Sequence, residues 1–219
     1  MSKQGLYKPA IDNIDKIIST LRKQYPEADD TSLNFENPFQ LLIATILAAQ
    51  STDKQVNKVT PDLFSHYQTP SELAQADISR LEQEIRSTGF FRNKAKSIKN
   101  CAGDIIKKFN GQVPSNIDDL TSLSGVGRKT ANVVLANAFE QQAIVVDTHM
   151  KRIAARLGLT TNSNPDKIEL DLQQVIPGNS WTDFSHKIIA FGRTICLGRN
   201  PKCSRCSILS WCRYGQENA

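Results

Sequence analysis

Four of the five cysteines lie close together near the end of the chain, in the spacing C-x6-C-x2-C-x5-C: Cys196, Cys203, Cys206 and Cys212. Thiolates so close in sequence can converge on one soft metal centre. Two disulfides are the alternative, which a reducing compartment disfavours. Zinc ribbons usually carry two C-x-x-C pairs, and this segment has one. The spacing therefore favours an iron–sulfur cluster over zinc.

A glycine turn between two short helical segments is the second chemical feature. Leu120–Leu135 reads LTSLSGVGRKTANVVL, with Gly125-Val126-Gly127 at its centre. The glycines allow a tight turn, and the N–H groups that open the following helix can face an anion. The segment predicts a hairpin that holds a DNA backbone phosphate without reading base sequence.

Two ionisable residues near this hairpin have two interpretations each. Lys129 falls in the first turn of the second helix, where the positive end of the helix dipole, helped by partial burial, favours a neutral nucleophilic amine. A simple phosphate contact explains it equally well. Asp147, before Thr148-His149, is either a helix N-cap or a catalytic carboxylate, and one residue can serve as both.

The charge distribution points to a polyanionic partner. The net charge is +5 and the pI about 9.0. No Asp or Glu occurs from Phe184 to Gln216, a stretch that contains six basic residues: Lys187, Arg193, Arg199, Lys202, Arg205 and Arg213. This stretch is either a phosphate-binding surface or a solvated tail.

Helices must position these residues, because the apolar residues recur with helical periodicity through nearly the whole chain. Apolar residues from Ile11 to Leu21 trace one helix, and the body of a second, from Leu41 to Ala49, is apolar on all sides. A stripe from Ile98 to Phe109, which includes Cys101 and Ile106, marks another core face. Ala143–Val146 is the one strand-like run and has no partner, so the fold class is all-α.

Helix start signals add detail to this pattern. Asn37 precedes Pro38 at a favoured first position. Thr52 with Gln55, and Thr69 with Glu72, fit capping boxes. Further helices are expected at 117–123, 129–139, 148–157, 165–175 and 181–196.

No secretory signal or membrane span is visible. The first ten residues are polar, and the longest apolar stretch, 38–49, is too short to cross a bilayer. We therefore expect a cytoplasmic protein with reduced thiols and no membrane partner.

Taken together, LSGVGRKTANVVL, VVDTH and the cysteine spacing resemble the endonuclease III family of helix–hairpin–helix DNA glycosylases. The likeness extends to LLIATILAAQSTD and GFFRNKA. The resemblance implies a two-lobed all-α fold. Residues 31–141 would form a six-helix barrel that contains the hairpin at about 117–136. Residues 1–30 and 142–219 would form the domain that binds a [4Fe-4S] cluster through the four cysteines.

The resemblance also implies an activity. A bacterial, nucleoid-associated monomer would bind damaged double-stranded DNA in the cleft between the lobes and flip an oxidised pyrimidine out of the stack. Lys129 would attack C1′, expel the base, and cleave the strand 3′ to the abasic site by β-elimination, with Asp147 as the second catalytic residue. Gln50 would fill the gap left by the base, and Phe90 would wedge into the opposite strand. The other DNA contacts would come from the hairpin and the cluster loop: Gly125, Val126, Gly127, Arg128, Thr130, Arg199 and Lys202.

Two departures and two alternatives accompany the resemblance. Ser124 stands where Pro usually precedes G-V-G, and Asn200 where a basic residue is common. An adenine glycosylase of the same superfamily would lack Lys129 and would carry a Glu within 41–53, where this chain has none. A non-enzymatic DNA-binding module would not need Lys129 paired with Asp147.

Overall fold

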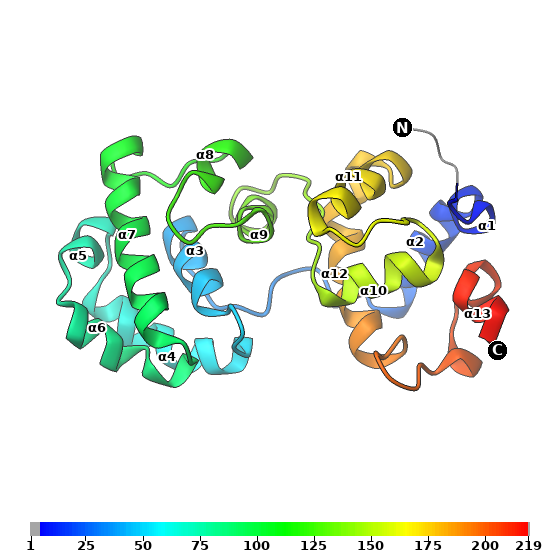
Figure 1. The fold of residues 1–219 in the computed structure, drawn as a ribbon, viewed down its shortest axis with the longest axis horizontal. Helices are drawn as coiled ribbons and strands as arrows, with labels where there is room; N and C mark the ends of the chain where they lie inside the picture. Colours follow the sequence, from blue (N-terminus) through cyan, green and yellow to red (C-terminus); the bar gives the residue numbers. More distant parts are fainter. Residues whose placement is uncertain (1–4, 219) are drawn as a thin grey trace. The chain divides into compact units, whose positions relative to one another are not determined.

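The computed structural model describes residues 5–218, and within that range it contains helices, turns and loops but no strand. The all-α prediction is confirmed (Figure 1). Residues 143–146, the strand-like run, are buried without forming a strand. Two backbone N–H groups of this run donate to side chains of the helix Trp181–Thr194 (α12). Ala143 N donates to Thr182 Oγ1 at 3.1 Å, and Val145 N donates to Ser185 Oγ at 3.1 Å.

The chain divides into two compact units. One is the uninterrupted stretch Thr31–Gln141, and the other joins Met1–Asp30 to Gln142–Ala219. We call them the inserted unit and the terminal unit. The chain passes from one unit to the other twice, and each unit has its own hydrophobic core.

The inserted unit contains eight helices among its described residues: α3 (Pro38–Leu47), α4 (Asp53–His66), α5 (Pro70–Gln75), α6 (Ile78–Glu84), η1 (Arg86–Thr88), α7 (Phe91–Phe109), α8 (Ile117–Thr121) and α9 (Arg128–Ala138). Helix α3 is buried along its whole body from Phe39 to Leu47, as its apolar sequence predicts. It packs against α4, α7 and α9, while α5 and α6 lie beside α7 (Figure 1).

Local start signals account for where several of these helices begin. Asn37 accepts a hydrogen bond from Gln40 N at 3.0 Å, with Pro38 at the first helical position. Thr69 and Glu72 form the reciprocal capping box at α5. At α4 only half of the expected box is present, because Thr52 caps Gln55 N while the Gln55 side chain donates to Ser87 Oγ at 2.8 Å.

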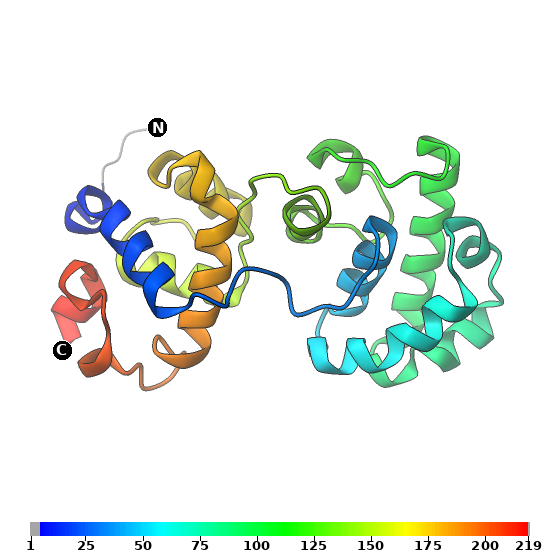
Figure 2. The ribbon, with the colours of Figure 1, turned by 180° about the vertical axis from the view of Figure 1, so that it is seen from behind.

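The terminal unit holds the remaining helices: α1 (Lys8–Asp12), α2 (Ile14–Gln24), α10 (Thr148–Leu157), α11 (Pro165–Val175), η2 (Gly178–Ser180), α12, η3 (Cys203–Arg205), η4 (Leu209–Trp211) and α13 (Arg213–Asn218). Phe184 and Phe191 of α12 are the largest fully buried side chains. They share one core with Ile17 and Leu21 of α2 and with Met150 of α10. Figure 2 shows α2 running beside α12.

Three further expectations about the fold were wrong in detail. The helix expected from Ile11 to Leu21 is broken at Asn13, whose backbone is not helical (φ −117°, ψ 21°) and whose Nδ2 donates to Pro9 O at 2.9 Å. Ile106, assigned to a core stripe, is exposed. Lys187, counted among the phosphate-binding residues, is buried, because Asp29, Asp183 and the carbonyl of Ala28 surround its ammonium group.

None of the helices in residues 5–218 has the length and apolar character needed to cross a membrane.

Candidate functional site

The hairpin of the inserted unit is formed by α8, the loop 122–127 and α9. Asn116 caps α8 by accepting from Asp119 N at 2.9 Å. Helix α9 begins after Gly127, which has no side chain to cap it, so the N–H groups of the first turn donate no hydrogen bond to an N-cap side chain. Val126 is buried and its N–H is used within the turn, on Leu123 O at 3.2 Å. The start of α9 is thus a helix N-terminus without a side-chain cap, a feature that can bind an anion.

Gly125 is required by two features of its position. Its φ of +77° lies in the left-handed region that side chains disfavour. A Cβ placed there would also meet Ser97 Cβ of α7 at 2.8 Å. The hairpin turn is therefore packed directly against α7, and no other residue type fits unless Ser97 or the turn shifts.

Lys129 stands in the first turn of α9, two residues after the Gly127 N-cap, as its sequence predicts. Its side chain is exposed rather than partly buried. The partial burial expected for Lys129 is therefore wrong, while its place at the helix N-terminus is as expected. Arg128 and Thr130 on either side are half-buried. The arrangement presents one reachable amine beside the anion-binding end of a helix.

Asp147 lies in the terminal unit and caps α10. Its Oδ1 accepts from Met150 N at 2.8 Å, and the residue is half-buried. The N-cap interpretation is thus correct. It leaves Oδ2 without a hydrogen bond from the described residues, so the carboxylate still has an oxygen available for chemistry.

Gln50 and Phe90 share an unusual backbone conformation. Both have positive φ, 53° and 48°, and both are exposed, Phe90 to 63%. Left-handed backbone is strained for side chains of this kind, and such strain clusters at functional sites. Gln50 follows the buried helix α3, and Phe90 immediately precedes α7. Both residues of the inserted unit are held outward at the end of a rigid element.

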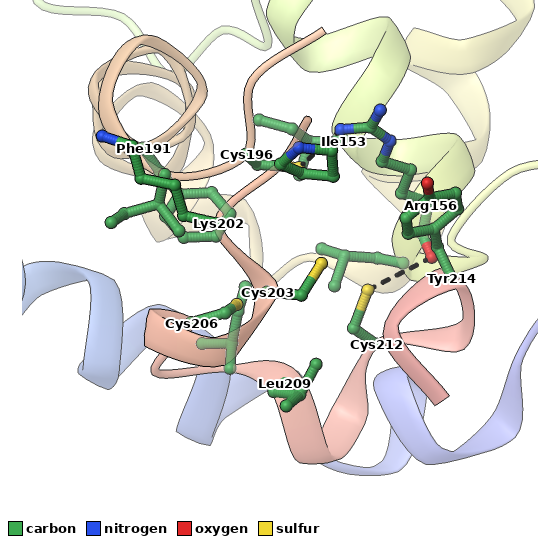
Figure 3. A pocket seen from close by; sticks show the side chains of 14 residues that line it. Ile153, Arg156, Phe191, Cys196, Lys202, Cys203, Cys206, Leu209, Cys212 and Tyr214 are labelled. Atoms are coloured by element: carbon green, nitrogen blue, oxygen red, sulfur yellow. Dashed lines mark hydrogen bonds between the residues drawn. The ribbon is translucent and has the colours of Figure 1, made fainter. Parts of the chain in front are cut away.

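The four C-terminal cysteines of the terminal unit surround one cavity (Figure 3). Its other walls come mainly from α10, α12 and the C-terminal loop and include Ile153, Leu157, Phe191 and Tyr214. No disulfide joins any cysteine among the described residues. Burial raises the pKa of Cys206 to about 11 and also raises that of Cys212.

Two arginines of α10 hold the segment that contains Cys196. Arg152 donates to Cys196 O through Nε at 3.1 Å and through Nη2 at 2.9 Å. Arg156 donates to Cys196 Sγ at 3.2 Å and to Leu197 O at 2.6 Å. Arg156 also lies over the ring of Tyr214, 4.8 Å from its centroid. The cysteine segment is thus fixed by charged donors, which interact favourably with thiolate and carbonyl groups.

The loop between Cys196 and Cys203 carries the expected basic residues outward. Arg199 and Lys202 are both exposed, and Asn200 between them has φ +50°. Lys202 N donates to Ile195 O at 3.0 Å, which closes the loop on the end of α12. Lys202 also borders the cysteine cavity (Figure 3).

Sequence reasoning missed three residues with a clear structural part in these sites. Arg152 and Arg156 are four residues apart on one helix face, directly after VVDTH, and that spacing was a usable signal. Asp104, which holds the hairpin loop, gave no signal, because its partner Ser124 lies twenty residues away.

Comparison with known proteins places these features in a family. Residues 43–178 match the model of the HhH-GPD superfamily base excision DNA repair proteins. Endonuclease III of Synechocystis sp. is 48% identical over 92% of this chain and 92% of its own. A solved structure of a trapped endonuclease III–DNA covalent intermediate is 42% identical, with a TM-score of 0.88 over 94% of this chain and 97% of that one.

A thermostable thymine-DNA glycosylase is more distant. It is 26% identical, with a TM-score of 0.85 over 95% of this chain and 99% of its own. The family match and the high identity along nearly the whole chain agree with the hairpin and with the cysteine segment. The chain therefore belongs to the HhH-GPD superfamily of base excision DNA repair proteins and, within it, to the endonuclease III family.

Proposed function

We propose that this protein is a base-excision repair enzyme that removes oxidised pyrimidines from duplex DNA and then cleaves the strand at the abasic site. The observation that carries the proposal is Lys129, an exposed amine in the first turn of a helix that opens on glycine. The likeness to an endonuclease III trapped covalently on DNA supports it. Substrate binding would use the hairpin residues 125–130, Gln50, Phe90, Arg199 and Lys202.

The reaction begins when the Lys129 amine bonds to C1′ of the flipped nucleotide and the N-glycosidic bond breaks. The base leaves with a proton, and the sugar ring opens to a protonated Schiff base. Loss of a C2′ proton then expels the 3′ phosphate oxygen. Water hydrolyses the imine and restores the free amine. Asp147 either balances the positive charge on the sugar or accepts the proton of Lys129.

Borohydride trapping tests the role of Lys129. Wild-type protein mixed with duplex DNA that contains an oxidised thymine should give a covalent adduct when the imine is reduced. Lys129→Ala should give none, while Lys107→Ala, at an exposed position near the far end of α7, should give the wild-type amount. Tight DNA binding by the wild type with no adduct would instead identify a non-enzymatic binding module.

Asp147→Asn separates capping from catalysis, because Asn caps helices as well as Asp does but carries no charge. We expect strand cleavage to slow by roughly a hundredfold or more, with DNA affinity changed far less. Asp77→Asn is the matched control, since Asp77 caps α6 through Arg80 N at 2.8 Å. If cleavage and binding fall equally in Asp147→Asn, the residue is a structural cap alone.

We further infer that the cysteine cavity holds a [4Fe-4S] cluster bound by Cys196, Cys203, Cys206 and Cys212. All four thiols line one apolar cavity, and Arg156 and the N–H of Gly215 donate to two of the sulfurs. The spacing C-x6-C-x2-C-x5-C has a single C-x-x-C pair, which favours an iron–sulfur cluster over a zinc ribbon. When bound, the cluster would supply covalent cross-links between α12 and the C-terminal loop.

Metal analysis and visible absorption test the cofactor. About four irons per chain with a broad visible band support the cluster. One equivalent of zinc with no iron would overturn it. Gel filtration tests the further proposal that the protein is a monomer.

A further inference from the structure

The hairpin loop of the inserted unit is attached to one face of α7. Ser97 of α7 packs against Gly125. Asp104 Oδ2 accepts from both Ser124 N, at 2.9 Å, and Ser124 Oγ, at 2.7 Å. Lys108 Nζ donates to Ser122 O at 2.8 Å. Positions 97, 104 and 108 are seven and four residues apart, so one helix face meets the loop at three successive points.

The carboxylate of Asp104 is well suited to this position. Its side chain is 22% exposed, and Lys108 Nζ lies 3.5 Å from Oδ1. The hydrogen bond from the Ser124 hydroxyl, the backbone bond from Ser124 and the charge of Lys108 hold the pKa of Asp104 below its usual value, against a smaller opposing effect of burial. The group is therefore charged at neutral pH and accepts both donors of a single residue.

Ser124 stands directly before Gly125 at the entry to the hairpin loop, and proline at this position is the useful comparison. Proline fixes φ and has no N–H to satisfy, so it stiffens the entry to the hairpin by itself. Serine leaves φ free and adds two donors. In this chain both donors end on one carboxylate of a neighbouring helix, which restricts the same backbone by a long-range contact.

We propose that Asp104 is the positioning residue of the hairpin anion site, acting through Ser124 to hold the N–H groups at the start of α9 toward a DNA phosphate. The proposal rests on the proposed function, since it assigns that phosphate to DNA. Asp104 itself does not touch DNA. Its removal loosens the loop, and the phosphate contact made by the hairpin is weakened or lost.

Binding of a duplex with a stable abasic-site analogue, measured by fluorescence anisotropy over a range of salt, tests this role. Asp104→Ala should weaken binding about tenfold, and the slope of log Kd against log salt should fall by about one, the loss of one phosphate contact. Asp104→Asn, which keeps an acceptor but no charge, should have an affinity and a salt slope between those of the wild type and of Asp104→Ala. Asp118→Ala is the control: it removes a carboxylate from an exposed position on α8 and should leave the slope unchanged.

Rescue distinguishes positioning from general damage. Ser124→Pro in the Asp104→Ala background should bring affinity to within about twofold of wild type, because proline needs no acceptor. Thermal unfolding confirms that each variant is folded. If Asp104→Ala binds DNA with the affinity and salt slope of Asp118→Ala, the positioning role is wrong and the proposed function stands. If wild-type protein shows no salt-dependent affinity for the duplex, both are wrong.

Discussion

Cys101 and the four C-terminal cysteines differ in environment although all five are free thiols. Cys101 is fully buried on α7, in the core of the inserted unit. Burial, with a smaller effect of Asp104, raises its pKa from 9.0 to about 12. Its sequence position on an apolar stripe predicted this part, since isolated buried cysteines behave as small apolar residues.

The native protein should therefore leave Cys101 unmodified by iodoacetamide at pH 9, where a free thiol is half ionised. Because its pKa in the folded protein is about 12, this thiol stays neutral until the pH approaches 12. The stability that the neutral thiol contributes is fully present below pH 9 and is lost as the pH rises from 9 toward 12. Mass spectrometry of the peptide measures the modification, and the denatured protein at the same pH is the control. Alkylation at the rate of a free thiol would contradict the assignment.

Local sequence patterns predicted the position of some functional residues but not the burial of others. The sequence identified Lys129 and Asp147 by type and position, and the structure places each in the first turn or at the cap of a helix as expected. It did not show that Lys187 is buried, because Asp29, its ion-pair partner, is 158 residues away. A charge count cannot distinguish a lysine paired in this way from one that faces solvent.

At the scale of elements, helix α7 connects two parts of the proposed DNA-binding surface. Phe90 sits at its N-terminus in left-handed backbone, and Lys94 in the first turn donates to Thr88 O at 2.7 Å from a buried position. Burial lowers the pKa of Lys94. Farther along, the same helix holds the hairpin loop. A helix of nineteen residues spans about 28 Å, so α7 is a rigid link between Phe90, the proposed wedge, and the hairpin loop, the proposed phosphate site.

Phe90→Gly and Phe90→Ala should lose DNA affinity equally, since both remove the exposed ring. They should differ in stability, because glycine adopts left-handed backbone without strain. We expect the glycine variant to be more stable by about 1 kcal/mol, measured by urea unfolding. Asn110, with φ 52° at the other end of α7, is the control. Its Gly variant should again be more stable than its Ala variant, but both should bind DNA as the wild type does. Equal stability of the two Phe90 variants would show that its backbone is not strained.

Helix boundaries were predictable where a capping residue marks them. Asn37 and Thr69 cap as expected. The break at Asn13 was not predictable, because the apolar spacing of Ile11 and Ile14 continues across it. Ile106 looked like a core residue for the converse reason: it fits the period, but its side chain is exposed on α7. Periodicity identifies a helix face, whereas the packing around it decides how wide the buried stripe is.

At the scale of the whole molecule, the two units differ in whether they are built from one continuous stretch of chain or from two. The inserted unit, Thr31–Gln141, is contiguous and has its own core around α3. The terminal unit needs α2 from the beginning of the chain and α10 and α12 from its second half. Ile17, Ile18 and Leu21 of α2 are fully or almost fully buried in that core.

A fragment that spans residues 31–141 should therefore fold alone, with a helical circular dichroism spectrum and a cooperative thermal transition. It should form less borohydride adduct than the full chain, at most as much as Asp147→Asn forms, because it lacks Asp147. A fragment of residues 142–219 should not fold cooperatively even when supplied with iron, since it leaves the apolar surface that α2 covers open to water. If the first fragment shows no cooperative transition, its core is not independent of the terminal unit. If the second fragment shows one, the terminal core does not need α2.

This arrangement has a consequence for biosynthesis. Helix α2 is translated among the first thirty residues, but α12, which it packs against, emerges more than 150 residues later. At the usual pace of translation that interval is roughly ten to thirty seconds. The inserted unit can condense on the ribosome during this time, while the apolar side of α2 waits unpaired. The nascent chain should be most exposed to chaperones and proteases at its oldest segment rather than at its newest.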